Sequence, residues 1–318
     1  MVEPEEPEIP EQIEDEFHYI ALRNDGTLFS IGDQTGKVSV TGKIPGIEFN
    51  TLFNSVTTSS SKTFIYEHYF DPPRGIIYVF EPSTETTTSV TLEFPEEFVQ
   101  NTALVSLDWD EDRQNLLGFA RQNFEEANNQ QAFKLVRIDP ENFKITTLEI
   151  DLYAQGYENV FSTTLINQKL YAVASKNDKW TSADLLEIDL EQKTINALPK
   201  NGITTSLINI GSGNDLTKIF GFTPVANSNL MAEVRPVIYN LNDKTSSELT
   251  AVPRISTLNP AHKTFFHQEK GEFVELVGAD NTKSIFTYQP STGDYSLLKT
   301  KSPNDLSSLV SIIGAVKI

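Results

Sequence analysis

A strand followed by a polar turn recurs six times along this chain, and we call the residue that begins each turn the anchor. The six anchors are Gly32, Glu81, Asp139, Asp189, Asn240 and Gln289. The residues one and three positions before each anchor are apolar in every copy, for example Ile188 and Leu186 in the fourth. This alternation predicts a strand with one buried face, and the Pro, Asn, Asp and Thr residues that follow suit a turn.

The spacing of the anchors predicts how the copies are assembled. They lie 49 to 58 residues apart, which suits four short strands with their turns. In the fourth copy we expect these strands at 159–167, 169–175, 183–189 and 193–199. A four-stranded antiparallel sheet cannot bury both faces alone, and stacking such sheets radially solves this problem. The sequence therefore predicts an all-β, six-bladed β-propeller of four-stranded antiparallel blades.

The two ends of the chain complement each other. The first copy lacks a leading strand, while the C-terminal segment 308–318, SLVSIIGAVKI, is a strand pattern without a blade of its own. Residues 17–32 and 290–318 together have about the length of one repeat. We expect the C-terminal strand to become the innermost strand of the first blade, because this closes the ring and leaves no open sheet edge there.

The copies FSIGDQTG and FTYQPSTG carry the closest likeness to a known group. The chain resembles the β-propeller superfamily, particularly the YVTN and quinoprotein-like repeats, whose blades carry a strand ending in Asp followed by Thr-Gly. The resemblance covers residues 17–318 in architecture. It implies a fold and no activity, because propellers host hydrolases, lyases, oxidoreductases and binding modules. The signatures of WD, kelch and sialidase repeats are absent from the sequence.

Composition excludes several classes of function. The chain has no cysteine, so disulfides, thiolate metal sites and thiol nucleophiles are excluded. Its net charge of −19 argues against a nucleic-acid partner, since such binding depends on Lys and Arg. No run of residues approaches the roughly 18 consecutive apolar residues of a transmembrane helix.

The N-terminal segment 1–16 differs from the rest. It holds eight carboxylates and no basic residue, with prolines spaced three apart at Pro4, Pro7 and Pro10. We expect a disordered, extended tether here and a single propeller domain over 17–318. Such a spacer resembles the region after the lipidated cysteine of bacterial envelope lipoproteins. That resemblance implies an extracytoplasmic protein, periplasmic or on the outer-membrane surface, with a lipid anchor upstream and a leader already removed. The alternative is the disordered tail of a cytosolic protein.

Compact catalytic or metal motifs are missing from the sequence. Asp108, Asp110 and Asp112 alternate as at the start of a calcium loop, but Arg113 replaces the required Gly and Phe119 the required Glu. We interpret this stretch as a solvated turn. No cofactor is indicated; a channel-bound calcium, as in gluconolactonase-like propellers, stays open without local support.

The four histidines are scattered at positions that do not match a metal-binding spacing. His18 and His68 fall within strand patterns and are interpreted as structural. His262 and His267 flank the sequence KTFF and are weak candidates for catalysis.

Loop length is the more informative signal for a binding site. Between their second and third strands, copies three to five carry the long segments RQNFEEANNQQ, SKNDKWTSA and TPVANSNLMAEVR, with Met231 in the last. The other three copies have short hairpins there. The aromatic, amide and carboxylate residues of these loops and of the connection DLYAQGYENV suit the binding of a sugar or peptide. The predicted ligand-binding residues are Phe124, Tyr153, Tyr157, Glu158, Asn159 and Trp180. The alternative is that these aromatic residues hold their own loops against the ring.

Two functional classes follow. The first is a non-catalytic binding or scaffolding propeller that engages a glycan or a protein through the long-loop face. The second is a propeller hydrolase or lyase, for example a calcium-dependent lactonase, with its site in the central channel. A cluster of carboxylates and amides at the channel mouth would favour the enzyme, and an aromatic shelf would favour the binding protein.

Overall fold

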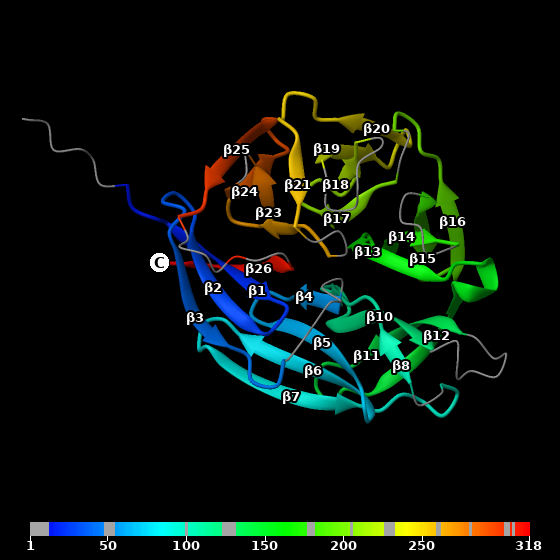
Figure 1. The fold of residues 1–318 in the computed structure, drawn as a ribbon. Helices are drawn as coiled ribbons and strands as arrows, with labels where there is room; N and C mark the ends of the chain where they lie inside the picture. Colours follow the sequence, from blue (N-terminus) through cyan, green and yellow to red (C-terminus); the bar gives the residue numbers. More distant parts are fainter. Residues whose placement is uncertain are drawn as a thin grey trace, which may run out of the picture.

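The protein is a β-propeller, with antiparallel sheets arranged around a central axis (Figure 1). The computed structural model describes residues 13–47, 55–98, 101–122, 132–176, 182–203, 206–225, 233–258, 262–279, 282–301, 306 and 309–318. Within these ranges no helix is long and apolar enough to cross a membrane.

The first sheet joins the two ends of the chain. It consists of β1 (Phe17–Arg23), β2 (Thr27–Gly32), β3 (Val38–Lys43) and β26 (Val310–Lys317), in the order β26-β1-β2-β3. Strands β1 and β26 pair antiparallel from Phe17 opposite Lys317 to Arg23 opposite Val310. The prediction that the C-terminal strand becomes the innermost strand of the first sheet is therefore confirmed.

The next three sheets follow the chain in order around the ring (Figure 1). The second sheet contains β4 (Val56–Thr58), β5 (Thr63–Phe70), β6 (Pro73–Glu81) and β7 (Thr86–Leu92). The third contains β8 (Thr102–Leu104), β9 (Asp108–Asp110), β10 (Asn115–Gln122), β11 (Phe133–Ile138) and β12 (Ile145–Asp151). The 3-10 helix η2 (Tyr153–Gln155) leads to the fourth, which contains β13 (Asn159–Ile166), β14 (Lys169–Ser175), β15 (Asp184–Asp189) and β16 (Thr194–Leu198). These last four strands coincide with the four segments predicted from the sequence.

The fifth and sixth repeats share one nine-stranded sheet. The fifth repeat contributes β17 (Ile208–Ser212), β18 (Lys218–Pro224), β19 (Glu233–Asn240) and β20 (Thr245–Glu248). The sixth contributes β22 (Phe265–His267), β23 (Glu272–Ala279), β24 (Thr282–Gln289) and β25 (Asp294–Lys299). Strand β21 (Ile255–Thr257) connects them, because it pairs with both β19 and β23. The sequence contained no signal for this connection.

The core lies between neighbouring sheets, as the alternating pattern requires. All twelve residues one or three positions before an anchor are buried. In the fourth repeat, Leu186 packs between the third and fourth repeats with Phe119 and Leu170. Six such apolar clusters occur among the described residues, each between two consecutive repeats. Burial of one large apolar side chain stabilises the fold by about 1.5–3 kcal/mol, so these clusters hold the ring together.

The Asp108–Asp112 stretch differs from its sequence-based interpretation as a solvated turn. Asp108 and Asp110 lie in β9 and are buried, and the exposed turn begins only after them. Asp110 accepts a hydrogen bond from the backbone N–H of Arg113 at 3.1 Å and another from its guanidinium at 3.1 Å. The interpretation was wrong for these two residues, because their partners supply the hydrogen bonds that water would otherwise supply.

Candidate functional site

A cavity of about 980 Å³ occupies the mouth of the central channel. Its walls include residues of β4, β9, β13, β17, β22 and β26, together with Phe17 of β1 and Thr63 of β5. Figure 1 shows β4, β13, β17 and β26 around the middle of the ring. The opening of the cavity is bordered by the turns after β4, β9 and β22 and by the turn between β6 and β7. We call this hollow the channel-mouth cavity. In an antiparallel blade these turns share one face of the ring, and the loops from second to third strand lie on the opposite face.

The floor of the channel-mouth cavity is a charged pair that crosses the channel. Lys263, just before β22, donates to Asp108 Oδ1 of β9 at 2.6 Å and also to the carbonyl oxygen of Leu107. The other carboxylate oxygen of Asp108 accepts from Thr163 Oγ1 of β13 at 2.7 Å. Three repeats, the third, fourth and sixth, therefore meet at this one carboxylate. Burial lowers the pKa of Lys263, although Asp108 acts to raise it.

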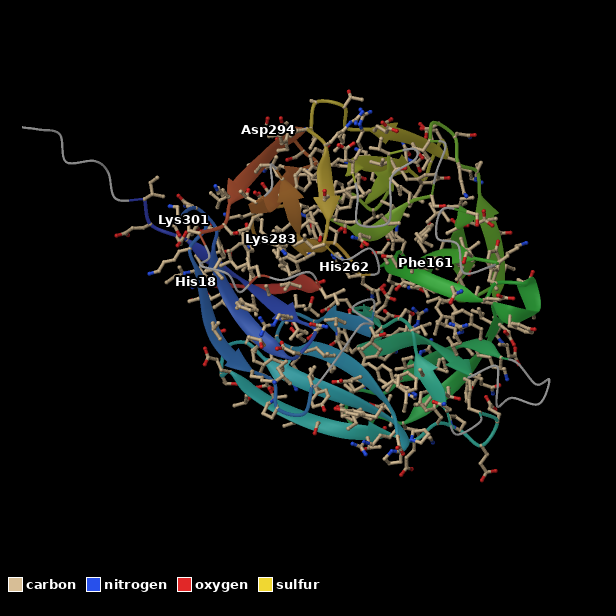
Figure 2. The ribbon with its side chains drawn as sticks, viewed as in Figure 1. His18, Phe161, His262, Lys283, Asp294 and Lys301 are labelled. Atoms are coloured by element: carbon tan, nitrogen blue, oxygen red, sulfur yellow. The ribbon has the colours of Figure 1, made fainter. Side chains whose placement is uncertain are left out.

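A second buried pair lies beside the first. Figure 2 shows His262 near the middle of the ring, and its Nε2 lies 2.6 Å from Oε1 of Glu275 on β23. The backbone carbonyl of His262 accepts from Ser162 Oγ at 2.9 Å. His262, Glu275 and Ser162 are all buried. These contacts hold the segment that carries Lys263 inside the channel.

His267 forms part of the cavity wall between the sixth and first repeats. Its ring meets the ring of Phe17 edge to face at a centroid distance of 4.5 Å, and its Nδ1 accepts from the backbone N–H of Lys270 at 3.2 Å. Burial lowers the pKa of His267, partly opposed by the nearby Glu272 carboxylate. A neutral imidazole that accepts at Nδ1 carries its proton on Nε2, and this buried Nε2 has no hydrogen-bond partner among the described residues.

Hydroxyl groups and aromatic rings make up much of the remaining lining. The described lining includes four aromatic side chains: Phe17, Trp109, Phe265 and Phe266. It also includes eleven Ser or Thr residues, among them the run Thr57–Ser61. The Oγ of buried Ser311 on β26 has no hydrogen-bond partner among the described residues.

Trp109 separates the channel-mouth cavity from a second hollow. It contributes to the lining of both, and the second hollow, of about 580 Å³, extends over the outer turns of the third repeat. Its ring stacks on Phe64 at 5.6 Å with an interplanar angle of 12°, and its Nε1 donates to Glu111 Oε2 at 2.5 Å. Trp109 is therefore a fixed, half-buried aromatic surface between two polar hollows.

The ionic charge of the lining is balanced. Its described residues include three lysines, Lys62, Lys263 and Lys317, and three carboxylates, Asp108, Glu111 and Glu269. Each has a partner: Lys62 lies 3.4 Å from Glu81, and Lys317 donates to Glu269 at 2.9 Å. Within the described parts of the chain, no group of three or more His, Asp or Glu side chains is arranged to hold a metal ion.

Four of the residues predicted from loop length, Tyr153, Tyr157, Glu158 and Asn159, lie on the other face of the ring. Tyr157 is buried, its hydroxyl donates to Asp184 at 3.0 Å, and burial raises its pKa to about 12. Tyr153 packs against the apolar cluster between the third and fourth repeats. Asn159 Oδ1 accepts from Arg121 at 2.8 Å, and the Glu158 N–H donates to the carbonyl of Ser175. The structure thus brings these four together at the foot of the fourth sheet.

The remaining predicted positions, Phe124, Trp180 and Met231, lie outside the described residues, so the long-loop site stays a prediction. His18 and His68 lie in strands as expected, and His68 Nε2 lies 2.8 Å from Asn101 Oδ1. His262 and His267, the weak catalytic candidates, both line the channel-mouth cavity. Sequence reasoning missed Asp108 and Lys263 as a pair, because 155 residues separate them.

No protein-family model matches the sequence, and no curated protein matches it. Solved structures do match it. An oligogalacturonate lyase in complex with manganese superposes with a TM-score of 0.51 at 11% identity, covering 92% of this chain and 80% of the lyase.

Two other solved structures have lower scores. A Trypanosoma rangeli sialidase in complex with sialic acid gives a TM-score of 0.47 at 11% identity over 95% of this chain and 55% of the sialidase. Porphyromonas gingivalis dipeptidyl peptidase 4 gives 0.42 at 8% identity over 88% of this chain and 43% of the peptidase. At 11% identity, the likeness to the lyase shows the β-propeller fold alone and assigns the chain to no family.

Proposed function

We propose that this protein is a non-catalytic binding propeller whose ligand is a neutral glycan held in the channel-mouth cavity. The observation that carries the proposal is the lining itself, which is hydroxyl-rich, bounded by aromatic rings and balanced in charge. Its buried Ser311 Oγ and His267 Nε2 have no hydrogen-bond partner among the described residues. Sugar hydroxyls both donate and accept hydrogen bonds, and sugar ring faces pack on aromatic side chains. A polar ligand would also supply partners for the two buried atoms.

Charge favours a neutral ligand over an acidic one. The chain carries a net charge of −19, while the described cavity lining has equal numbers of lysines and carboxylates. The ammonium of Lys263 is already paired with Asp108. An acidic sugar would therefore meet the repulsive field of the whole molecule without an unpaired cation to offset it.

The pairing of the charged groups supports binding over catalysis. A general acid or base needs a side chain within reach of the substrate and in a suitable protonation state. Asp108 accepts from both Lys263 and Thr163, and Glu275 lies against His262. The hydrolase or lyase alternative would need a ligand that rearranges these pairs.

We also propose the finer features that the sequence suggested. The six apolar clusters support six blades, with the nine-stranded sheet divided at β21. The acidic, Pro-rich composition of the N-terminal segment supports a tethered, extracytoplasmic envelope protein, and the repeats FSIGDQTG and FTYQPSTG support a relation to YVTN-type propellers. The long-loop face, with Tyr153, Tyr157, Glu158 and Asn159, is a second contact surface that would suit a protein partner.

The two tryptophans of the chain allow the two faces to be tested separately. Trp109 lies at the channel-mouth cavity and Trp180 in the predicted long-loop site. Neutral and acidic oligosaccharides, and calcium with and without a chelator, are titrated while tryptophan fluorescence and thermal stability are followed. We expect neutral oligosaccharides to quench the fluorescence and to raise Tm, in the Trp180→Phe variant as well as in the wild type.

Variants at Trp109 test whether the ligand binds in the channel-mouth cavity. Trp109→Phe keeps the stack on Phe64. This variant is expected to bind neutral oligosaccharides without the quenching of tryptophan fluorescence. Trp109→Ala is expected to weaken binding about tenfold or more, as for an aromatic anchor in a binding site. Binding that survives Trp109→Ala but is lost in Trp180→Ala would move the site to the long-loop face. A calcium-dependent stabilisation, or turnover of a lactone or oligosaccharide, would favour the enzyme instead.

A further inference from the structure

The turn after the first anchor lacks the side chain that accepts backbone hydrogen bonds in three of the equivalent turns. In the fourth repeat, Asp189 Oδ1 accepts from the backbone N–H groups of Glu191 and Gln192, at 3.0 and 2.9 Å. Asp139 and Asn240 likewise accept from the N–H group two residues ahead. The first anchor is Gly32, which has no side chain to do this.

Asp15, from the segment before β1, makes the same hydrogen bonds in the first turn. Its Oδ1 accepts from the backbone N–H groups of Gln34 and Thr35 at 2.9 and 2.7 Å. Its Oδ2 accepts from the hydroxyl of Thr35 at 2.6 Å. Gln34 and Thr35 stand two and three residues after Gly32, as Glu191 and Gln192 do after Asp189.

Gly32 makes room for this carboxylate. A Cβ atom added at Gly32 would lie 2.1 Å from Oδ2 and 2.4 Å from Cγ of Asp15, far closer than real atoms approach. The φ of Gly32 is not in the left-handed region, so the backbone itself does not demand glycine. The glycine is explained by the carboxylate of Asp15 beside it.

The residues after Asp15 extend the attachment to both ends of the chain and to the sixth repeat. The N–H groups of Glu16 and Phe17 both donate to Asp33 Oδ1, at 2.9 and 3.1 Å. Oδ2 of the fully buried Asp33 side chain accepts from Lys270 Nζ at 2.5 Å. The N–H of Ile318 donates to the carbonyl of Glu16 at 3.1 Å.

We propose that residues 13–16 form a strap that fastens the closing sheet, with Asp15 supplying from outside the turn the side chain that Gly32 lacks. Burial acts to raise the pKa of Asp15, but the hydrogen bonds from Thr35 and Gln34 lower it below its usual value, so the carboxylate is charged at neutral pH. This contribution to stability is present above the unfolded-state pKa near 4 and is lost as the pH falls below it.

The strap also lies close to the channel-mouth cavity. Phe17 and Lys317, on either side of the strap, line this cavity. Residues 13–16 are therefore on the same face of the ring as the cavity.

The test moves the carboxylate back into the turn. Asp15→Ala is expected to lower Tm by about 1–3 °C, the shift expected for losing one capping interaction in a chain of this size. It should also speed proteolytic cleavage within residues 13–16. Adding Gly32→Asp to Asp15→Ala is expected to restore Tm, because the new side chain occupies the vacated space, while cleavage stays fast. Asp15→Asn, which keeps one acceptor oxygen, should fall between wild type and Asp15→Ala.

Two control variants test whether the effect is specific to Asp15. Glu14→Ala removes an exposed neighbouring acid and is expected to leave Tm and cleavage unchanged. Asp189→Ala removes the equivalent side chain of the fourth turn and is expected to lower Tm by a similar amount without affecting cleavage of the strap. An unchanged Tm and cleavage rate in Asp15→Ala, or a failure of Gly32→Asp to recover Tm in that variant, would overturn the proposal.

Discussion

The centre of the ring and the exposed turn between β17 and β18, which we call the rim, hold ion pairs of nearly equal length in very different surroundings. At the centre, Lys263 Nζ lies 2.6 Å from Asp108, with side chains 16% and 5% exposed. At the rim, Lys218 Nζ lies 2.8 Å from Asp215, with side chains 40% and 41% exposed. Distance alone would rank the two pairs as equivalent.

The ionisation of these groups shows how the pairs differ. Burial lowers the pKa of Lys263 even though Asp108 acts to raise it, so removal from water outweighs the attraction there. At the rim, hydrogen bonds from Lys218 and Thr217 lower the pKa of Asp215 to about 2, against only weak desolvation. The central pair therefore specifies which segments meet in the channel, while the rim pair adds little beyond local order.

The largest effect is expected from breaking the central pair on one side. Lys263→Met leaves Asp108 buried, with Thr163 as its remaining side-chain donor among the described residues. This change should reduce the free energy of unfolding by about 3–5 kcal/mol. Urea unfolding followed by circular dichroism measures this loss.

The matched control removes both charges. Because the central pair is dominated by desolvation, the double variant Lys263→Met with Asp108→Asn should recover most of the stability. If the double variant were as unstable as Lys263→Met alone, the central pair would contribute net stability, and the contrast with the rim would fail.

An intermediate effect is expected at His267, on β22 in the wall of the channel-mouth cavity. Burial lowers its pKa below the usual 6.5, so the unfolded chain takes up a proton at a pH where the folded protein does not. Stability is then complete above about pH 6.5 and falls as the pH drops below that value.

This dependence can be removed by substitution. His267→Phe, placed among Phe17, Tyr19 and Phe265, should unfold with a smaller difference between about pH 7.5 and pH 5.5 than the wild type. An equal loss of unfolding free energy between these two pH values in both proteins would mean that protonation of His267 does not destabilise the folded state.

The smallest effect is expected at the rim. Asp215→Ala should change the free energy of unfolding by less than about 0.5 kcal/mol at neutral pH, because solvent screens an exposed pair. The contribution of Asp215 is present above the unfolded-state pKa near 4 and is lost as the pH falls toward 2. Thermal unfolding at several salt concentrations measures it, and a loss comparable to that of Lys263→Met would contradict the distinction drawn between the two pairs.

The strand pattern and the closure of the ring could be predicted because short stretches of sequence indicate both. Residues such as Leu186 and Ile188 alternate with polar neighbours, and the unmatched C-terminal strand fits the vacant place beside β1. These signals need no knowledge of distant contacts.

The cavity could not be predicted in the same way. Its floor joins Asp108 and Lys263 from opposite parts of the chain, and the acidic stretch around Asp108 has the composition of an exposed turn. The strap has one signal in the sequence: Gly32 is a glycine, whereas the other five anchors carry polar side chains. Only the position of Asp15 shows what that glycine accommodates.

Strand β21 makes the boundary between the fifth and sixth repeats unlike the others. It shares ladder pairs with both repeats, whereas Asn201 and Thr245 link the fourth and fifth, and Lys37 and Lys301 the sixth and first, by one isolated bridge each. No backbone bridge joins the second, third and fourth repeats among the described residues. The repeats are thus joined unevenly around the ring. Thermal opening should begin between the second, third and fourth repeats, where the described residues form no backbone bridge and where a side-chain hydrogen bond from Thr163 to Asp108 links the third and fourth repeats.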